Sequence, residues 1–297
     1  MAPIIAGARR RARAAGLSAV DGQVLRELAL VHVPGHGEPR IEALRGGSLN
    51  RSFKVTRDER PCVLRVDAGS CGTAPAPGVD RAWERRVLQA AAGAGIGPRI
   101  VACEPAAGVL VTAWVDGVEW SAEHAAAPAS QAQMAGLVRR VHALIVPEPV
   151  RRMSVRDWRD LYREQQRHEA PDSQESLRLA QLDVRAESLL DQYEALSGAR
   201  SCLCHSDLHR HNMLWSGQCG CLLDWEYAHV GDPFWDLAGW TCSNALSPAA
   251  RNEFVNAYLG RKPRPDEQAR LALLMRLYES ICDSWAAIAA AQPPRAP

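Results

Sequence analysis

The sequence predicts an α+β protein of two lobes, in which a small antiparallel sheet precedes a larger, mainly helical region. Short runs rich in β-branched and apolar residues, separated by turn residues, occupy residues 40–66 and 100–115 and indicate strands. From residue 116 onward the apolar residues recur at the spacing of amphipathic helices. We therefore expect an N-terminal lobe over residues 1–115 and a helical C-terminal lobe over residues 116–297.

Composition and charge argue against several classes of protein. Hydrophobic residues make up 47% of the chain, and the formal net charge is +1, so neither disorder nor an overall attraction to nucleic acid or membranes is expected. No window has the apolar length of a transmembrane helix or a secretory signal, and the nine cysteines are odd in number and scattered. We expect a cytoplasmic protein with reduced thiols. Its assembly stays open, with a homodimer as one alternative.

The N-terminal lobe is expected to begin with a helix over residues 19–32, followed by strands over residues 40–44, 52–55 and 61–66. The first two strands flank a glycine-rich turn, which predicts a hairpin. Glycines in such a turn let backbone N–H groups approach phosphate oxygens. The candidate nucleotide-binding residues of this turn are Gly46, Gly47, Ser48 and Asn50.

The third strand and the helix after it offer an ion pair. Val63 and Arg65 share one face of the strand, because alternate side chains of a strand point the same way. A helix is expected over residues 80–94, and Glu84 lies in its first turns. In kinases this face of the strand looks into the nucleotide cleft, and a glutamate of the next helix pairs with a basic residue of the strand. By that analogy we expect Val63 and Arg65 to face a nucleotide, with Glu84 paired to the guanidinium group. An exposed arginine and a solvated glutamate are the alternative.

A second hairpin, over residues 100–103 and 108–115, is expected to complete the sheet. Residues 111–115 are expected to form its last strand and the hinge between the lobes. Backbone groups there can hydrogen-bond the edge of an adenine, and apolar side chains can enclose its ring. Thr112 and Trp114 are therefore candidate nucleotide contacts.

The C-terminal lobe is expected to contain at least six helices. Asp232 and Pro233 are typical of a helix start, and Asp236 lies one turn into that helix, where it can reach back toward the loop described next. The other helices follow from apolar residues at helical spacing and are expected over residues 131–145, 155–169, 173–196, 248–259 and 266–290.

One stretch of the chain carries the chemistry. His205, Asp207 and Asn212 form the pattern H-x-D-x-x-x-x-N, and a short apolar strand follows that ends at Asp224. This is the arrangement of a kinase catalytic loop followed by a metal-binding aspartate. Asp207 would orient a hydroxyl group and take its proton, while Asn212 and Asp224 supply the oxygen ligands that Mg²⁺ prefers. His205 is expected to brace the loop rather than act as an acid. Ordinary polar turn residues are the alternative.

Cysteines near this loop raise a second alternative, a zinc site. Alternate residues of a strand can converge, but the C-x-C spacing differs from the usual C-x₂-C spacing of zinc knuckles, and cysteine is also a common small core residue. We favour magnesium chemistry over zinc. The residues that define the zinc alternative are Cys202, Cys204, Cys219 and Cys221, with His209 and His211 between them.

From Gly46 to about Gln292 the sequence resembles the choline kinase and aminoglycoside phosphotransferase superfamily, most of all its bacterial choline-kinase-like and thiamine-kinase-like members. The resemblance implies a protein-kinase-like fold, the cofactors ATP and Mg²⁺, and phosphorylation of a hydroxyl on a small molecule. It implies Asp207 as the base and Asn212 with Asp224 as magnesium ligands. The motifs that support it occupy residues 46–55, 63–66, 205–212, 223–228 and 231–238.

Two positions depart from wider kinase patterns. Arg65 stands where many members have lysine, although arginine here fits choline-kinase-like members. Ser206 precedes Asp207 where regulated protein kinases carry arginine, which removes the usual anchor for a phosphorylated activation loop. The resemblance therefore implies constitutive activity on a small molecule and argues against phosphorylation of proteins.

The acceptor is expected to be a small cationic alcohol, choline-like first and thiamine second. Quaternary ammonium groups bind aromatic cages through cation–π attraction. An aminoglycoside acceptor, and a catalytically inactive module that only binds a nucleotide or metabolite, are the alternatives. The candidate substrate-binding residues are Tyr227, Trp240, Tyr278 and Trp285, with Glu226, Glu279 or Asp283 as counter-charge, and core packing is the alternative role for each aromatic ring.

Overall fold

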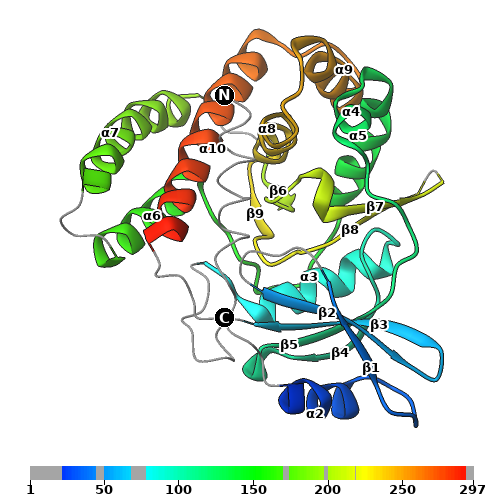
Figure 1. The fold of residues 1–297 in the computed structure, drawn as a ribbon. Helices are drawn as coiled ribbons and strands as arrows, with labels where there is room; N and C mark the ends of the chain where they lie inside the picture. The colour runs from blue at the N-terminus through cyan, green and yellow to red at the C-terminus, as the bar shows by residue number, and fades with distance from the viewer. Residues whose placement is uncertain are drawn as a thin grey trace.

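The computed structural model describes residues 22–44, 50–67, 78–169, 174–196, 200–217 and 219–291. These residues form a sheet at one end of the molecule and a mainly helical region at the other (Figure 1). The structure confirms the predicted α+β class, with an antiparallel sheet in the N-terminal part and helices in the C-terminal part. Among the described residues, no helix combines the length and the apolar content needed to cross a membrane.

The sheet has five antiparallel strands in the order β1-β2-β3-β5-β4. β2 and β3 meet at a tight turn in which Asp58 and Glu59 have positive φ angles of 45° and 61°, as a two-residue hairpin turn of type I′ requires. The turn lies between the two strands that the sequence predicted over residues 52–55 and 61–66. The strands are β1 (Arg40–Ala43), β2 (Asn50–Arg57), β3 (Arg60–Asp67), β4 (Ile100–Glu104) and β5 (Val109–Ala113).

The two faces of this sheet differ in chemistry. On one face, apolar residues such as Val55, Leu64 and Val111 pack against helix α2 (Gly22–His32) and form a small separate core. On the other face, Lys54, Val63 and Thr112 lie opposite one another in register, and Ser52, Arg65 and Leu110 form the next row. The alternation of side chains along the strands thus separates a packed face from a face that presents polar groups.

Helix α3 (Arg81–Gly93) connects the sheet to the larger core. Asp80 caps its first turn by accepting a hydrogen bond from the N–H of Trp83, and Trp83, Val87 and Leu88 are buried. They belong to the same apolar core as the helices of the C-terminal part, which fixes the face that carries Arg65 relative to those helices.

The remaining helices surround that core, and α6 and α9 begin and end where the sequence predicted. α5 begins three residues before its predicted start, because Pro128 takes the first helical position, where proline is well tolerated. The short helix α4 was not predicted. The helices are α4 (Ala122–Ala126), α5 (Pro128–His142), α6 (Val155–Glu169), α7 (Gln174–Glu194), α8 (Pro233–Ser243), α9 (Pro248–Leu259) and α10 (Pro265–Ala291).

Two small sheets lie between these helices and frame the H-x-D motif. β6 (Cys202–Cys204) pairs with β9 (His229–Gly231), and β7 (Met213–Ser216) pairs with β8 (Cys219–Leu222). The motif occupies the connection from β6 to β7, which ends in the 3₁₀ turn η3 (Arg210–Asn212); a second such turn, η2 (Pro105–Ala107), joins β4 to β5.

Candidate active site

The motif loop is anchored by an aspartate of helix α8. Asp232 caps this helix and Pro233 takes its first position, as predicted. One turn in, the carboxylate of Asp236 accepts hydrogen bonds from the backbone N–H groups of His205 at 2.8 Å and Ser206 at 2.7 Å. Asp236 is 1% exposed, so these charge-assisted bonds are shielded from water. The expectation that Asp236 braces the loop is confirmed.

His205 braces the same loop from inside. Its side chain is fully buried, and its ring stands 4.6 Å from that of Trp225. Its Nε2 lies 3.0 Å from the carbonyl oxygen of Leu223. Burial lowers the pKa of His205, so the ring is neutral at physiological pH. The geometry agrees with the predicted bracing role.

Asp207 lies at the partly exposed side of the loop, with a side chain that is 21% exposed. The amide nitrogen of Asn212 donates to its Oδ2 at 2.8 Å and to its carbonyl oxygen at 3.0 Å. The Nε2 of His209 is 3.4 Å from the same Oδ2, a contact that the sequence analysis did not anticipate. Because both bonds from Asn212 use its amide nitrogen, the amide oxygen is the atom of that side chain that can bind a cation.

Asp224 is brought beside this loop by the backbone. The N–H of Leu223 donates to the carbonyl oxygen of Asn212 at 2.8 Å, and Asp224 itself has a positive φ of 61°. Such a conformation is uncommon outside glycine and occurs often at functional sites. It turns the chain directly after β8.

The surroundings of Asp224 suit a divalent cation. Its Oδ1 is buried without a hydrogen bond in the described part of the chain, and the nearest cation is Nη1 of Arg65 at 3.5 Å. Burial raises the pKa of Asp224, and the carboxylate of Glu226 adds to that effect. An unsatisfied carboxylate oxygen among further acids fits a hard cation with oxygen ligands, so Mg²⁺ fits these residues.

Arg65 and Glu84 form the predicted ion pair. The guanidinium group donates from Nη1 to Oε1 at 2.6 Å and from Nη2 to Oε2 at 2.7 Å, a bidentate arrangement. Burial disfavours the charged form of both groups, but for each group the attraction to its partner outweighs this penalty. The pKa of Arg65 is therefore raised and that of Glu84 is lowered. The pair fixes the guanidinium group close to Asp224.

Arg81, which the sequence analysis missed, joins this pair to a wider network. Its Nε donates to Asp67 at 2.5 Å, and its Nη1 donates to Glu84 and to Glu226, both at 2.8 Å. Its Nη2 donates to the amide oxygen of Asn50 at 2.8 Å. One sequence signal was available, because Arg81 precedes Glu84 by one helical turn. Its other partners depend on the tertiary structure.

Asn50 and Glu226 are held by each other and by Arg81. The amide nitrogen of Asn50 donates to Oε2 of Glu226 at 2.7 Å, and both residues are buried. The structure thus places Asn50, a predicted nucleotide contact, and Glu226, a predicted substrate contact, in one link between β2 and the segment after Asp224. Gly46, Gly47 and Ser48 lie outside the described residues, so their predicted role stays a prediction.

The other predicted nucleotide contacts lie on the polar face of the sheet. Val63 and Thr112 are direct cross-strand neighbours. Trp114, just beyond β5, is half-buried, and the ammonium group of Lys54 stands 4.4 Å from its ring centroid. Its indole N–H donates to Asp116 at 3.1 Å. Their contact with a nucleotide remains a prediction.

Two of the predicted substrate residues belong to the core. Trp240 is fully buried, and its indole N–H donates to Oε1 of Gln131 at 3.0 Å. Tyr278 is 4% exposed, packs 5.3 Å from the ring of Trp235 and shares a hydrogen bond of 3.1 Å with Ser243. These contacts favour core packing, the alternative role for Trp240 and Tyr278, because both rings pack helix α8 against its neighbours.

Tyr227 and Trp285 have different surroundings. Trp285 is half-buried on α10 and packs against the core. The ring of Tyr227 stands 5.8 Å from that of Trp158, which in turn stands 6.3 Å from that of Tyr162. Burial raises the pKa of Tyr227, and the charges of Glu226 and Asp207 add to the shift, so this ring lies within electrostatic reach of Asp207. Trp158 and Tyr162, one turn apart on α6, were missed by the sequence analysis.

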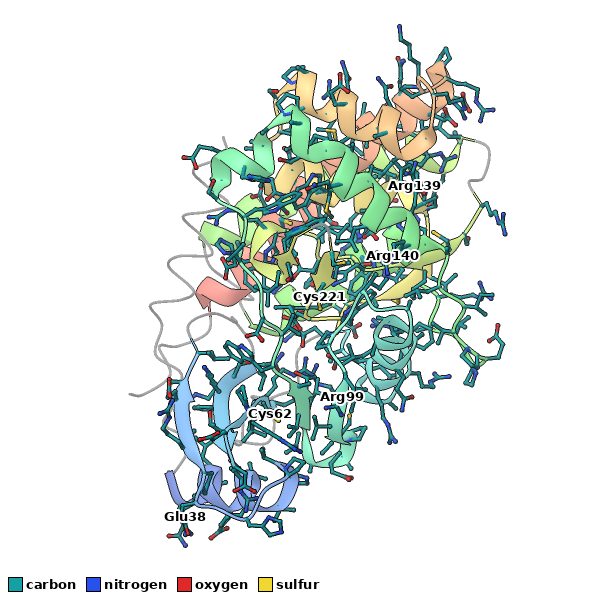
Figure 2. All side chains as sticks on the ribbon, turned by 90° about the vertical axis from the view of Figure 1, so that its right-hand side faces the viewer. Glu38, Cys62, Arg99, Arg139, Arg140 and Cys221 are labelled. Carbon is teal, nitrogen blue, oxygen red and sulfur yellow. The ribbon has the colours of Figure 1, made fainter. Side chains whose placement is uncertain are left out.

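The structure does not assemble the zinc set that the sequence suggested. His211 binds Glu119 at 2.8 Å, His209 faces Asp207, and Cys219 is exposed. The side chains in Figure 2 place Cys221 in the small β7–β8 hairpin and Cys62 far away in the large sheet. Within the described ranges, the one group of metal-binding side chains close to each other is Cys202, Cys204 and His142.

Comparison with known proteins gives a family match over most of the chain. A family model described as "Phosphotransferase enzyme family" matches residues 40–274. No curated protein matches this chain significantly in sequence.

Solved structures share the fold at low identity. A choline/ethanolamine kinase family protein from Mesorhizobium loti is 24% identical with a TM-score of 0.67, over 94% of this chain and 85% of that chain. The choline kinase LicA from Streptococcus pneumoniae is 16% identical with a TM-score of 0.71, over 90% and 89% of the two chains, and a LicA structure in complex with AMP is also similar. A spectinomycin phosphotransferase in complex with ADP and spectinomycin is 15% identical with a TM-score of 0.60, over 87% and 85%.

Proposed function

Because this chain belongs to the phosphotransferase enzyme family, we propose that it transfers the terminal phosphoryl group of ATP to the hydroxyl of a small cationic alcohol, with a choline-like acceptor first. Family membership and the shared fold confirm the predicted superfamily, and they make the chain a small-molecule phosphotransferase. The identities of the nucleotide, the metal ion and the acceptor are part of the proposal.

The proposal depends on one observation about the site. Asp207, Asn212 and Asp224 lie together, with Asn212 bonded to the carboxylate of Asp207 and the backbone before Asp224 bonded to the carbonyl of Asn212. A binding module needs no carboxylate oriented beside two cation ligands, whereas phosphoryl transfer needs both.

Each of these residues has a distinct task. Asp207 accepts the proton of the acceptor hydroxyl and directs its oxygen toward the phosphorus atom. Asn212 orients Asp207 through its amide nitrogen, while its amide oxygen and the carboxylate of Asp224 would hold Mg²⁺. The bound ion supplies positive charge to the phosphate oxygens. Asp236 keeps the loop in place through the backbone of His205 and Ser206.

The nucleotide is expected to lie along the polar face of the sheet. Arg65 presents a fixed charge to the phosphates, because Glu84 binds it in bidentate fashion. The backbone near Thr112 and Trp114 is proposed to contact the adenine edge. The AMP bound by the similar LicA protein supports nucleotide use.

The half-buried ring of Tyr227, on which the charge of Asp207 acts, supports a cationic acceptor. Its ring neighbour Trp158, and Tyr162 beyond it, are buried in the core and hold Tyr227 in place. A π face close to a carboxylate attracts an organic ammonium group. Thiamine, also a cationic alcohol, is the second candidate. An aminoglycoside is the third, because the fold is shared with antibiotic phosphotransferases.

A coupled assay of ADP release tests the proposal. We expect ATP turnover to rise with choline, ethanolamine or thiamine, and to be lost in Asp207→Asn while ATP binding is retained. Stimulation by an aminoglycoside or spectinomycin alone would replace the cationic-alcohol acceptor. Tight ATP binding with no turnover on any acceptor would instead identify a binding module.

A further inference from the structure

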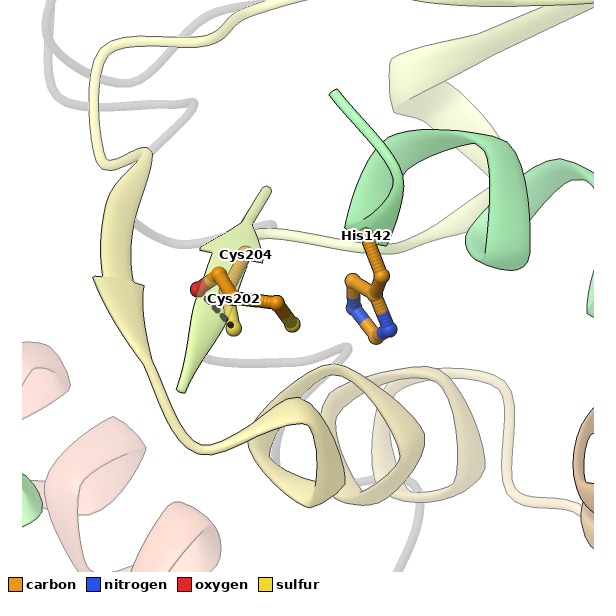
Figure 3. Close-up of side chains that lie close together, drawn as sticks. All are labelled: His142, Cys202 and Cys204. Carbon is orange, nitrogen blue, oxygen red and sulfur yellow. Dashed lines mark hydrogen bonds between the residues drawn. The ribbon is translucent and has the colours of Figure 1, made fainter. Parts of the chain in front are cut away.

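Behind the catalytic loop, three side chains with soft donor atoms converge. They are His142 at the end of α5 and Cys202 and Cys204 on β6, and one donor atom from each lies within 4.8 Å of the others (Figure 3). We propose that these three residues bind a thiophilic divalent metal ion of the zinc class. None of these three ligands is assigned a task in the phosphotransferase reaction.

The local structure explains the convergence. Cys202 and Cys204 are two residues apart on one strand, so both sulfur atoms project from the same face of β6. The last turn of α5 packs on that strand and brings the imidazole of His142 toward the sulfur atoms, as Figure 3 shows. Cys204 bonds weakly to carbonyl oxygens, at 3.7 Å from Cys202 and 3.4 Å from Asp232, which keeps its sulfur in place.

The spacing of the donors is close to that of a bound ion. Zinc–sulfur bonds of about 2.3 Å in a tetrahedral site hold two sulfur atoms about 3.8 Å apart. The three donor atoms here, within 4.8 Å of one another, therefore need to approach by at most about 1 Å. Rotation of the half-buried Cys202 side chain can supply much of that movement, because it is not enclosed on all sides.

The imidazole of His142 already has the outer partners of a metal ligand. Its Nδ1 lies 2.8 Å from the hydroxyl of Tyr258, and its Nε2 lies 3.1 Å from Oδ2 of Asp236. Whichever nitrogen binds the ion, the other keeps an oxygen partner that fixes the ring. Such a partner on the second ring nitrogen is a general feature of histidines that bind metals.

The electrostatics also favour a cation that replaces protons. The hydrogen bond with Cys204, together with His142, lowers the pKa of Cys202, although burial opposes the charge on its thiolate. Burial disfavours the charge on His142, but the bond to Asp236 outweighs it and raises the pKa to about 9. A zinc ion would displace the proton of His142 and that of Cys204.

The donor set selects the class of ion. Two sulfur atoms and one imidazole nitrogen suit Zn²⁺ or Cd²⁺ and do not suit Mg²⁺, which prefers oxygen. The site therefore differs in preference from Asn212 and Asp224 on the other side of the loop. Three protein ligands leave a fourth position for water or another small ligand.

Titration of the metal-free, fully reduced, full-length protein with Cd²⁺ tests the proposal, with thiolate-to-metal absorption in the ultraviolet as the signal. We expect one ion per chain, displacement of Cd²⁺ by Zn²⁺, and no effect of excess Mg²⁺. Cys202→Ser should weaken binding at least about tenfold, since it removes a direct ligand. The matched control is Cys219→Ser, an exposed cysteine on β8, which should leave the titration unchanged.

Two further measurements make the result decisive. A thiol count before titration and a circular dichroism spectrum show that each variant is reduced and folded, and His142→Gln provides a second variant on a different element. No absorption band in the reduced wild-type protein overturns the proposal. So does a band of unchanged affinity in folded Cys202→Ser and His142→Gln. Zinc should also raise the melting temperature of the wild-type protein and not that of Cys202→Ser.

Discussion

On one side of the catalytic loop the side chains offer oxygen, from Asp207, Asn212 and Asp224. On the other side, Cys202 and His142 offer sulfur and nitrogen. The oxygen side is partly exposed and rich in carboxylates, and Asp224 there has a buried oxygen that makes no hydrogen bond to the described residues. The sulfur side is more enclosed, and its imidazole is bonded at both nitrogen atoms.

Asp236 belongs to both sides. Its carboxylate accepts from the backbone of His205 and Ser206 toward the oxygen side, and from the imidazole of His142 toward the sulfur side. One buried carboxylate thus positions the reactive loop and orients a residue of a second cluster. The comparison teaches that two clusters with different chemistry can share one structural anchor, so a substitution can separate them or disturb both.

The largest effect on activity is expected from a substitution that changes the oxygen side alone. Asp207→Asn removes the proton acceptor and keeps the shape of the side chain, so we expect kcat to fall roughly 10²- to 10⁴-fold. Steady-state kinetics on the best acceptor measures this change. Glu253→Gln, an exposed acid on α9, is the matched control and should leave kcat unchanged. A drop of less than about tenfold would contradict the role of Asp207 as base.

Disturbing the shared anchor should affect both sides. Asp236→Asn removes the carboxylate partner of His142 and weakens the bonds to two backbone N–H groups, so we expect the free energy of unfolding to fall by about 3 kcal/mol. Urea denaturation measures the loss, and kcat should fall as well. An unchanged urea midpoint together with normal kcat would show that the loop does not depend on this carboxylate.

The ion network on the oxygen side can be broken at Arg81, the residue that joins its members. Arg81→Leu leaves Asp67, Glu84 and Glu226 without a shared partner, and we expect a loss of about 2 kcal/mol in the free energy of unfolding. KM for ATP should rise because Glu84 and Arg65 lose alignment. Arg85→Leu, an exposed arginine on the same helix, should change neither quantity. Equal effects of the two variants would contradict a specific role for Arg81.

The contribution of the sulfur side to stability should depend on pH. The pKa of His142 is raised to about 9 in the folded protein, above its ordinary value near 6.5, so its contribution to stability is complete below about pH 6.5 and is lost as the pH rises through 9. Asp236, Tyr258, Cys202 and Cys204 face this ring. The lowered pKa of Cys202 acts in the opposite sense, because its contribution is lost as the pH falls through about 6.

His142→Asn should therefore destabilise the protein by about 1–2 kcal/mol near pH 6.5 and by less at pH 9.5. Urea denaturation at both pH values, each compared with the wild-type protein, checks the difference. A destabilisation that is the same at both values would mean that His142 contributes packing alone and carries no charge in the folded state.

The smallest effect is expected from a substitution on the oxygen side that tests how the acceptor binds. Tyr227→Leu removes a ring near the catalytic carboxylate and should raise KM for a cationic acceptor about fivefold, which corresponds to a cation–π contribution of about 1 kcal/mol. Tyr227→Phe keeps the ring and should change KM less than twofold. If both variants behave alike, or if KM for a neutral alcohol rises as much, the aromatic contact with a cation is not present.

Much of the fold followed from local patterns. The strands of the sheet, the turn at Asp58 and Glu59, the start of α8 and helices α6 and α9 lie where turn residues and apolar spacing predicted them. The pair of Arg65 and Glu84 was also predicted, by analogy with the ion pair of kinases once strand alternation and the helix position were known. These features depend on residues close in sequence or on one strand and one helix, so the periodicities of the chain are sufficient.

Other features required the packed structure. In the sequence, Trp240 and Tyr278 cannot be distinguished from aromatic residues that enclose a ligand. Only their burial in the folded structure shows that they pack in the core. Arg81 contacts Asn50, 31 positions away, and Glu226, 145 positions away, so its role as a hub has no local signature. His142 lies far from Cys202 in sequence, so the zinc alternative drawn from local spacing did not include it.

The sequence by itself located the candidate reactive residues, because a loop of the kinase type keeps a carboxylate and an amide at a fixed short spacing between two strands. It also determined the order and type of the main elements, because side-chain periodicity is local. The tertiary structure decided which charges neutralise one another, which aromatic rings are buried and which donors meet behind the loop. Those outcomes depend on contacts between distant segments, where burial and desolvation, rather than spacing, set the energy.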